Sequence, residues 1–96
     1  MSSQQLNDVD AVLAKRGSRY GLFVDHADIT QGFKNYQLGI LIGNGKKLSP
    51  SQAEALDMIY HKIGRILNGD PNYADSWVDI AGYAKLVADE LTGNVK

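Results

Sequence analysis

The sequence of 96 residues contains no cysteine, which excludes a disulfide framework and a thiolate zinc site. Any metal ion would therefore need oxygen or imidazole ligands. The most apolar stretch, Leu38 to Ile42, is far shorter than the roughly 20 residues that a membrane-spanning helix needs. The first ten residues are polar and lack the pattern of a secretory signal. These absences predict a protein of the bacterial host cytoplasm without a membrane span.

The sequence also lacks an excess of positive charge. Its net charge is -1, with acidic and basic residues interspersed, which argues against general nucleic-acid binding. Hydrophobic residues make up 44% and charged residues 22%, which is ordinary for a globular protein and excludes a disordered chain. A chain of this length supports one small core, so we expect a single domain over residues 1–96 and a homo-oligomer that enlarges the core.

Apolar residues recur at steps of three and four along several segments, which predicts an all-α fold. The clearest helix is predicted at residues 50–68. Ser49 and Gln52 form a capping box, and Pro50 suits the first helical position. Gly69 predicts a left-handed stop at the other end of this helix.

Three further helices are predicted at residues 3–16, 26–42 and 73–92. The first ends before Gly17, and the second begins with Asp25 as its cap. Because the turn between the last two helices is short, these helices pack antiparallel. We therefore expect a small antiparallel bundle of about four helices that ends in a helical hairpin.

Glycines inside the predicted helices indicate close helix contacts, because each costs up to about 1 kcal/mol relative to alanine. Gly32 and Gly39 predict that another helix approaches the second helix, and Gly82 predicts a further close contact. Gly64 is expected opposite the large Trp77 in the hairpin. Aromatic residues at helical spacing are expected in the core, namely Phe33, Tyr60, Trp77 and Tyr83.

Asp75 and Asp79 lie four residues apart, so their carboxylates share a helix face and repel each other. Such a pair could bind magnesium or manganese, which prefer carboxylate oxygen. In the alternative interpretation, Asp75 complements the helix dipole and Asp79 pairs with a base. The antiparallel geometry places Lys62 opposite Asp79 and Arg65 near Asp75. The other acidic pair, Glu54 with Asp57, lies at a different height, so a four-carboxylate cage is not predicted.

Four basic residues could bind a phosphate group. Lys62 and Arg65 share a helix face, while Arg16 and Arg19 lie in the predicted loop at residues 16–21. Guanidinium groups bind phosphate with two hydrogen bonds, and glycines let backbone N–H groups approach it. The spacing differs from that of a phosphate-binding P-loop, and a plain surface loop is the alternative.

His26 and His61 form no recognisable metal motif, and we expect both to be structural. No serine lies in a nucleophile elbow, and cysteine is absent, so covalent acyl chemistry has no candidate residue. Whether the chain is an enzyme is left open by these residues.

Two runs in the second half carry a family resemblance, HKIGRIL at residues 61–67 and DSWVDIAGYAKL at residues 75–86. They resemble small bacteriophage and prophage proteins akin to nucleotide modification associated domain 1. The most specific positions are Lys62, Arg65, Asp75, Asp79 and Tyr83. The resemblance implies a phage accessory protein in nucleotide or DNA modification metabolism, with an acidic helical pattern similar to that of MazG-type nucleotide pyrophosphatases.

Two functions follow as hypotheses. In the first, a phage-encoded accessory protein binds a nucleotide or another phosphorylated small molecule, and any turnover would be metal-assisted attack of water on a phosphoanhydride. In the second, the chain is a non-catalytic oligomeric interaction module that binds a host or phage protein.

Overall fold

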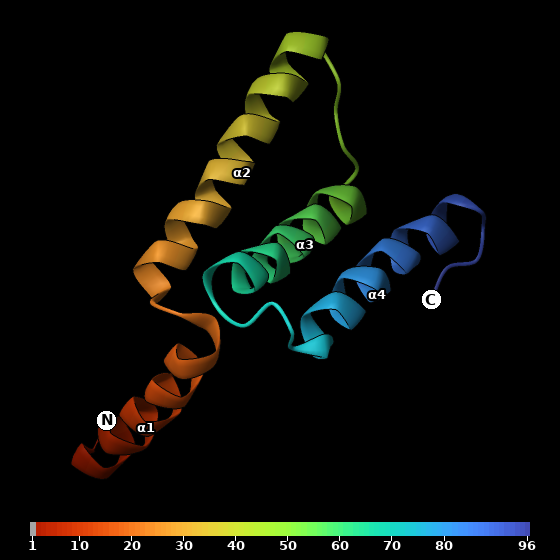
Figure 1. Ribbon diagram of the computed structural model, residues 1–96. Coiled ribbons are helices and arrows are strands. Elements are labelled where there is room, and N and C mark those ends of the chain that lie inside the picture. Colours follow the sequence, from red (N-terminus) through yellow and green to blue (C-terminus); the bar gives the residue numbers. More distant parts are fainter. Residues whose placement is uncertain (1) are drawn as a thin grey trace.

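The structure, a computed structural model, describes residues 2–96 and confirms the all-α fold (Figure 1). The helices of this part of the chain are α1 (Ser3–Tyr20), α2 (Phe23–Asn44), α3 (Pro50–Asn68) and α4 (Ala74–Leu91). The last two form the expected antiparallel hairpin. None of these helices is long and apolar enough to cross a membrane.

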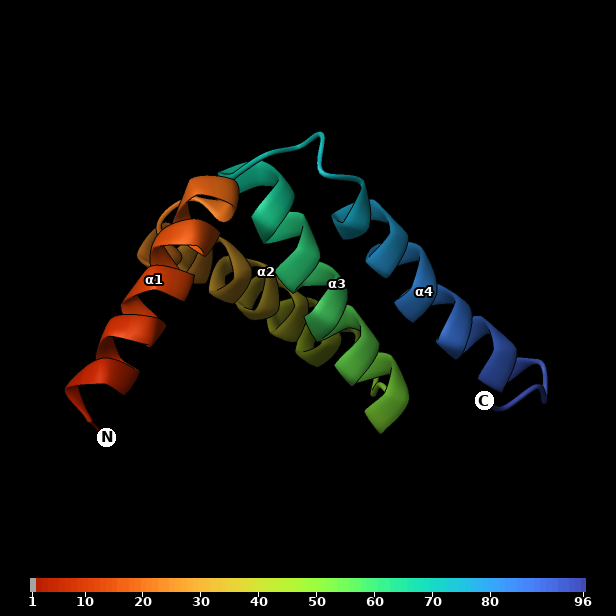
Figure 2. The ribbon, with the colours of Figure 1, turned by 90° about the horizontal axis from the view of Figure 1, so that it is seen from below.

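The central helix of the bundle is α3, which packs against α2 on one side and α4 on the other. Among the described residues, α1 meets α2 and α3, and its C-terminal half lines a pocket together with them. Figure 2 shows α1 and α4 on opposite sides of the α2–α3 pair, diverging from the end at which the α1–α2 and α3–α4 connections lie. The C-terminal ends of α1 and α3 and the N-terminal ends of α2 and α4 therefore lie at this end.

The start of α3 is the predicted capping box. The backbone N–H of Gln52 donates to Ser49 Oγ at 3.1 Å, and the Ser49 N–H donates to Gln52 Oε1 at 2.9 Å. Pro50 occupies the first helical position. These bonds satisfy N–H groups that a helix start would otherwise leave unpaired. The same motif, built from Ser2 and Gln5, begins α1.

The N-terminal helix is longer than predicted. It continues through Gly17 to Tyr20, so most of the predicted loop at residues 16–21 is helical. Gly21, with φ of 79°, ends it instead. Glycine is tolerated in a helix at a modest cost, which is why Gly17 does not act as a breaker. The predicted cap of α2 is also wrong, because Leu22 holds the cap position and Asp25 lies in the first helical turn.

Hydrogen bonds attach the end of α1 to the α3–α4 turn. The side-chain Nδ2 of Asn68 donates to the carbonyl oxygens of Tyr20 at 3.0 Å and of Leu22 at 2.9 Å. The Asp70 N–H donates to the Arg19 carbonyl at 2.8 Å. The bonds to Arg19 and Tyr20 pair backbone carbonyls that the end of α1 would otherwise leave free.

Two glycines allow this attachment. A methyl group on Gly69 would overlap the Arg19 carbonyl oxygen and Cα of Tyr20, and one on Gly21 would overlap the Asn68 carbonyl oxygen. Gly69 has φ of -132°, so the predicted left-handed stop is wrong. Its role is to let the two chain segments approach each other.

A third glycine brings α2 against α3. A Cβ atom on Gly64 would lie 2.9 Å from the His26 ring and 2.9 Å from Cγ2 of Thr30. The predicted partner, Trp77, is instead 56% exposed, and its indole N–H donates to the Pro71 carbonyl at 2.9 Å. The predicted Gly64–Trp77 contact is therefore wrong, because the small residue of α3 faces α2 rather than α4.

Little apolar surface is buried within the described residues. Ala55 and Ile66 are their only hydrophobic residues with less than about a tenth of the surface exposed. The positions of Gly32, Gly39 and Gly82 have open space around them, so the close contacts predicted there are not found in this part of the chain. Exposed large apolar side chains occur on all four helices.

Candidate functional site

The α3–α4 hairpin contains an ion pair that the sequence predicts. Lys62 Nζ lies 2.9 Å from Asp79 Oδ2, and the lysine side chain is largely buried. Asp75 accepts a hydrogen bond of 2.8 Å from the Tyr73 hydroxyl. Arg65 was predicted to lie near Asp75, but the two form no ion pair among the described residues. These contacts match the structural interpretation of Asp79.

A metal site at this hairpin has incomplete support. Within residues 2–96, no three His, Asp or Glu side chains gather so that they could hold a metal ion. Asp75 and Asp79 thus lack a third protein ligand in the described chain, and Asp79 already has a cationic partner. The magnesium or manganese site stays a prediction.

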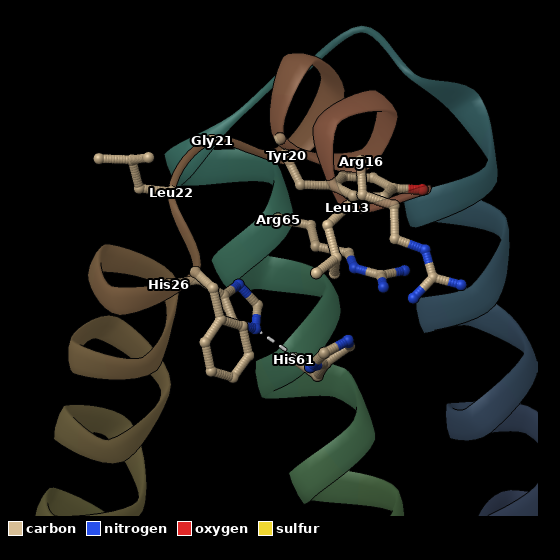
Figure 3. Close-up of a pocket in the computed structure, with 10 residues that line it drawn as sticks. Leu13, Arg16, Tyr20, Gly21, Leu22, His26, His61 and Arg65 are labelled. Carbon is tan, nitrogen blue, oxygen red and sulfur yellow. Dashed lines mark hydrogen bonds between the residues drawn. The ribbon is translucent and has the colours of Figure 1, made fainter. Parts of the chain in front are cut away.

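A pocket of about 470 Å³ lies where α1, the start of α2 and the second half of α3 meet (Figure 3). Its walls are mainly apolar and aromatic, and no carboxylate is among the side chains that form them. The lining residues are Leu13, Arg16, Gly17, Tyr20, Gly21, Leu22, Phe23, His26, His61 and Arg65. The attachment of α1 described above therefore creates one wall of this pocket.

Two of the four predicted phosphate-binding residues, Arg16 and Arg65, line the pocket. Figure 3 shows their guanidinium groups on the same side of it. The Arg65 guanidinium lies over the Tyr20 ring, 4.1 Å from the ring centre, which is a cation–π arrangement. Among the described residues, no carboxylate lies within ion-pair distance of either arginine.

The other two predicted residues lie elsewhere. Arg19 stacks over the Tyr73 ring at 4.2 Å, and Lys62 pairs with Asp79. Neither is among the residues that line the pocket. Of the four predicted phosphate-binding residues, Arg16 and Arg65 therefore lie in the pocket. Arg19 and Lys62 instead contact Tyr73 and Asp79, outside it.

Sequence reasoning missed a histidine pair at the floor of the pocket. His26 Nε2 and His61 Nδ1 are 3.1 Å apart, a hydrogen bond in which one ring donates and the other accepts (Figure 3). The rings meet edge to face with their centres 4.6 Å apart. His26 is buried, and its Nδ1 has no hydrogen-bond partner in the described chain. The one available signal was that His61 lies a helical turn before Gly64, the residue that admits His26.

Both histidines favour the neutral form. Burial lowers the pKa of His61 from 6.5 to about 4, and the positive charge of Arg65 adds to this effect. Burial and Arg65 also lower the pKa of His26, while the Gly64 backbone acts in the opposite direction. The imidazoles therefore offer uncharged hydrogen-bonding groups at neutral pH, and the positive charge of the pocket comes from its arginines.

The fold and site define a small helical bundle with an apolar pocket bordered by two guanidinium groups. The chain belongs to the family described as domain of unknown function DUF6378, whose model matches residues 5–91. This range includes every pocket residue. No match was found among curated proteins or among solved structures.

Proposed function

We propose that the chain binds a nucleotide or another phosphorylated small molecule in the pocket between α1, α2 and α3. The observation that carries this proposal is the presence of Arg16 and Arg65, without acidic partners among residues 2–96, beside apolar and aromatic walls. Guanidinium groups match phosphate oxygens in charge and geometry. Aromatic rings and aliphatic side chains suit the base or another apolar part of the ligand.

The size and polarity of the pocket fit such a ligand. Its volume of about 470 Å³ lies within the range of roughly 300–1,000 Å³ usual for small-molecule sites. His61 adds an uncharged ring that can donate or accept one hydrogen bond. A phosphate would therefore meet two fixed positive charges, and no lining carboxylate would repel it.

The resemblance of residues 61–67 and 75–86 to nucleotide modification associated domain 1 supports the same ligand class. We propose that this binding step belongs to the nucleotide or DNA modification metabolism of a phage, as the resemblance implies. We propose binding rather than hydrolysis, because the predicted metal ligands Asp75 and Asp79 do not line the pocket.

A comparison of two charge-removing variants of α1 tests the proposal. Arg16→Gln removes a pocket guanidinium, whereas Lys15→Gln removes one positive charge from the same helix outside the pocket lining. A panel of nucleoside triphosphates, with and without magnesium, is screened by thermal shift and then titrated by calorimetry. A charge-assisted hydrogen bond contributes about 1.5–3 kcal/mol, so Arg16→Gln should raise the Kd tenfold or more.

The control Lys15→Gln should bind within about twofold of the unmodified protein, because its charge is solvent-screened and outside the pocket. If no nucleotide of the panel shifts the melting temperature of the folded protein, the nucleotide form of the proposal is wrong. The same holds if both variants lose affinity equally, which would indicate only a diffuse effect of net charge.

A second candidate function is a non-catalytic oligomeric module that binds a host or phage protein. The observation that favours it is the exposure of large apolar side chains on every helix, since such patches usually mark protein contacts. Light scattering combined with capture of host proteins distinguishes the candidates. A stable, identified host partner together with no nucleotide effect would favour this second function.

A further inference from the structure

The single chain exposes more surface than a compact protein of its mass. Its accessible area is 6948 Å², whereas a folded monomer of 10.5 kDa is expected to expose about 5,400 Å². The radius of gyration, 16.4 Å, likewise exceeds the roughly 12.5 Å expected for a compact domain of this length. The excess of about 1,500 Å² is in the range that each partner buries in an obligate dimer.

Two adjoining apolar grooves lie beside α3 and offer a place for such a contact. The first, of about 430 Å³, lies between α2 and α3, and the second, of about 310 Å³, lies between α3 and α4. Leu48 and Leu56 line both grooves, so the two are continuous. We call this surface the groove face; Tyr36, Ile40 and Ile59 also line it.

The groove face carries no charge. Neither groove is lined by an Asp, Glu, Lys or Arg side chain, and its polar groups are few. One of them, the Tyr60 hydroxyl, already donates to Gln37 Oε1 at 2.6 Å. A partner that covers this face must therefore be apolar as well, because an unpaired charge or polar group buried there would be costly.

The α2 side of the groove face is the most open. Tyr36 is 75% exposed and Ile40 is 45% exposed, although they lie one helical turn apart on the same side of α2. Apolar residues occur all round α2, a pattern typical of a helix covered on more than one side. Within the described chain, α2 packs against α3 and meets α1 only at its start.

We infer that a second copy of this chain covers the groove face, so that the groove faces of two copies meet across a two-fold axis. An isologous contact brings each patch against itself, and an uncharged apolar patch does so without like-charge repulsion. This inference deepens the second candidate function by locating the contact between copies of the oligomeric module, and it rests on that candidate. It does not depend on ligand binding, because Arg16, Arg65 and the histidines lie outside the groove face.

Two charge insertions of equal size test the inference by light scattering over a range of concentrations. Tyr36→Glu places a carboxylate in the groove face, and Val78→Glu places one on α4 at a site that is 64% exposed and outside both grooves. The unmodified protein and Val78→Glu should have twice the chain mass of 10.5 kDa. Tyr36→Glu should weaken dimerisation at least a hundredfold or unfold the chain.

Because unfolding of Tyr36→Glu would leave the location of the contact open, single cysteines supply a second measurement. The chain has no cysteine of its own, so Tyr36→Cys and Val78→Cys each carry one thiol for maleimide labelling. Their labelling rates would be similar in a single chain, where both positions are largely exposed. In the dimer, labelling at position 36 should be at least tenfold slower than at position 78.

A folded protein that stays at 10.5 kDa at 100 µM, or equal labelling rates at the two positions, would overturn the inference. Nucleotide titrations of the same samples separate its failure from that of the ligand proposal. A monomer that binds nucleotide would refute only the dimer, and a dimer that binds none would refute only the ligand site.

Discussion

At the residue scale, the histidine pair links the packing of α2 on α3 to the chemistry of the pocket. His26 is buried beside Gly64, and its ring contacts His61, which lines the pocket together with Arg65. Because both rings are partly removed from water and face a guanidinium, protonation of either is unfavourable in the folded state. The folded chain therefore prefers the neutral pair.

This preference predicts a pH dependence of stability. The pKa of His61 is about 4 in the folded state and about 6.5 in the unfolded state, so the unfolded chain binds more protons between these values. The contribution of His61 is complete above pH 6.5 and is lost as the pH falls towards 4. The melting temperature should fall in this window by about 5 °C more in the unmodified protein than in His61→Asn, roughly a 1 kcal/mol effect.

Differential scanning fluorimetry at half-unit steps from pH 7.5 to pH 4 measures this difference. Subtracting the His61→Asn curve removes the contribution of the carboxylates, which titrate in both proteins. Parallel curves for the two proteins would show that His61 titrates normally in the folded state.

Some side-chain contacts of this site could be predicted from the sequence, and others could not. The Lys62–Asp79 pair was predictable because a short turn fixes the heights of α3 and α4 relative to each other. The His26–His61 contact was not, because the residues lie 35 positions apart and their contact depends on which faces of α2 and α3 meet. Hydrophobic periodicity identifies which face of a helix is apolar, but not which residue of another helix meets it.

At the element scale, α3 was predicted most accurately, with both its ends at the expected residues. Its start has a side-chain signal, the capping box, that acts locally. The end of α1 has no such local signal. It is set by hydrogen bonds from Asn68 and Asp70, far along the chain, and by the close approach of Gly21 and Gly69.

The packing of α2 on α3 gives a prediction for Gly64. Gly64→Ala introduces a Cβ atom 2.9 Å from His26 and Thr30, closer than carbon atoms pack without displacement. We expect the free energy of unfolding to fall by about 1–3 kcal/mol, the usual cost of overpacking. Urea denaturation followed by circular dichroism measures this change.

Gly82→Ala is the matched control, because Gly82 lies inside α4 with open space around its Cα. Alanine is the better helix former, so this variant should be unchanged or more stable by up to about 1 kcal/mol. Equal stability of Gly64→Ala and the unmodified protein would contradict the close contact of α2 and α3 at this position.

At the scale of the whole molecule, the described helices form a connected arrangement around α3 rather than a closed core. The number and type of helices followed from the sequence, since apolar periodicity reports local structure. The extent of burial could not be predicted from the sequence. The pattern of apolar residues in one chain is the same whether its own helices or a second copy cover these residues. Trp77 and the glycines of α2 illustrate this, as they were expected in close contacts and lie exposed.

The central claim is that a phosphorylated small molecule binds where α1, α2 and α3 meet. Backbone amide NMR spectra recorded during titration with a nucleoside triphosphate test it most directly. The account predicts the largest shifts at Gly17, Gly21 and His61, which line the pocket, and small shifts at Glu54, which lies outside it. Shifts centred on the α4 segment, or none at millimolar ligand, would contradict the claim.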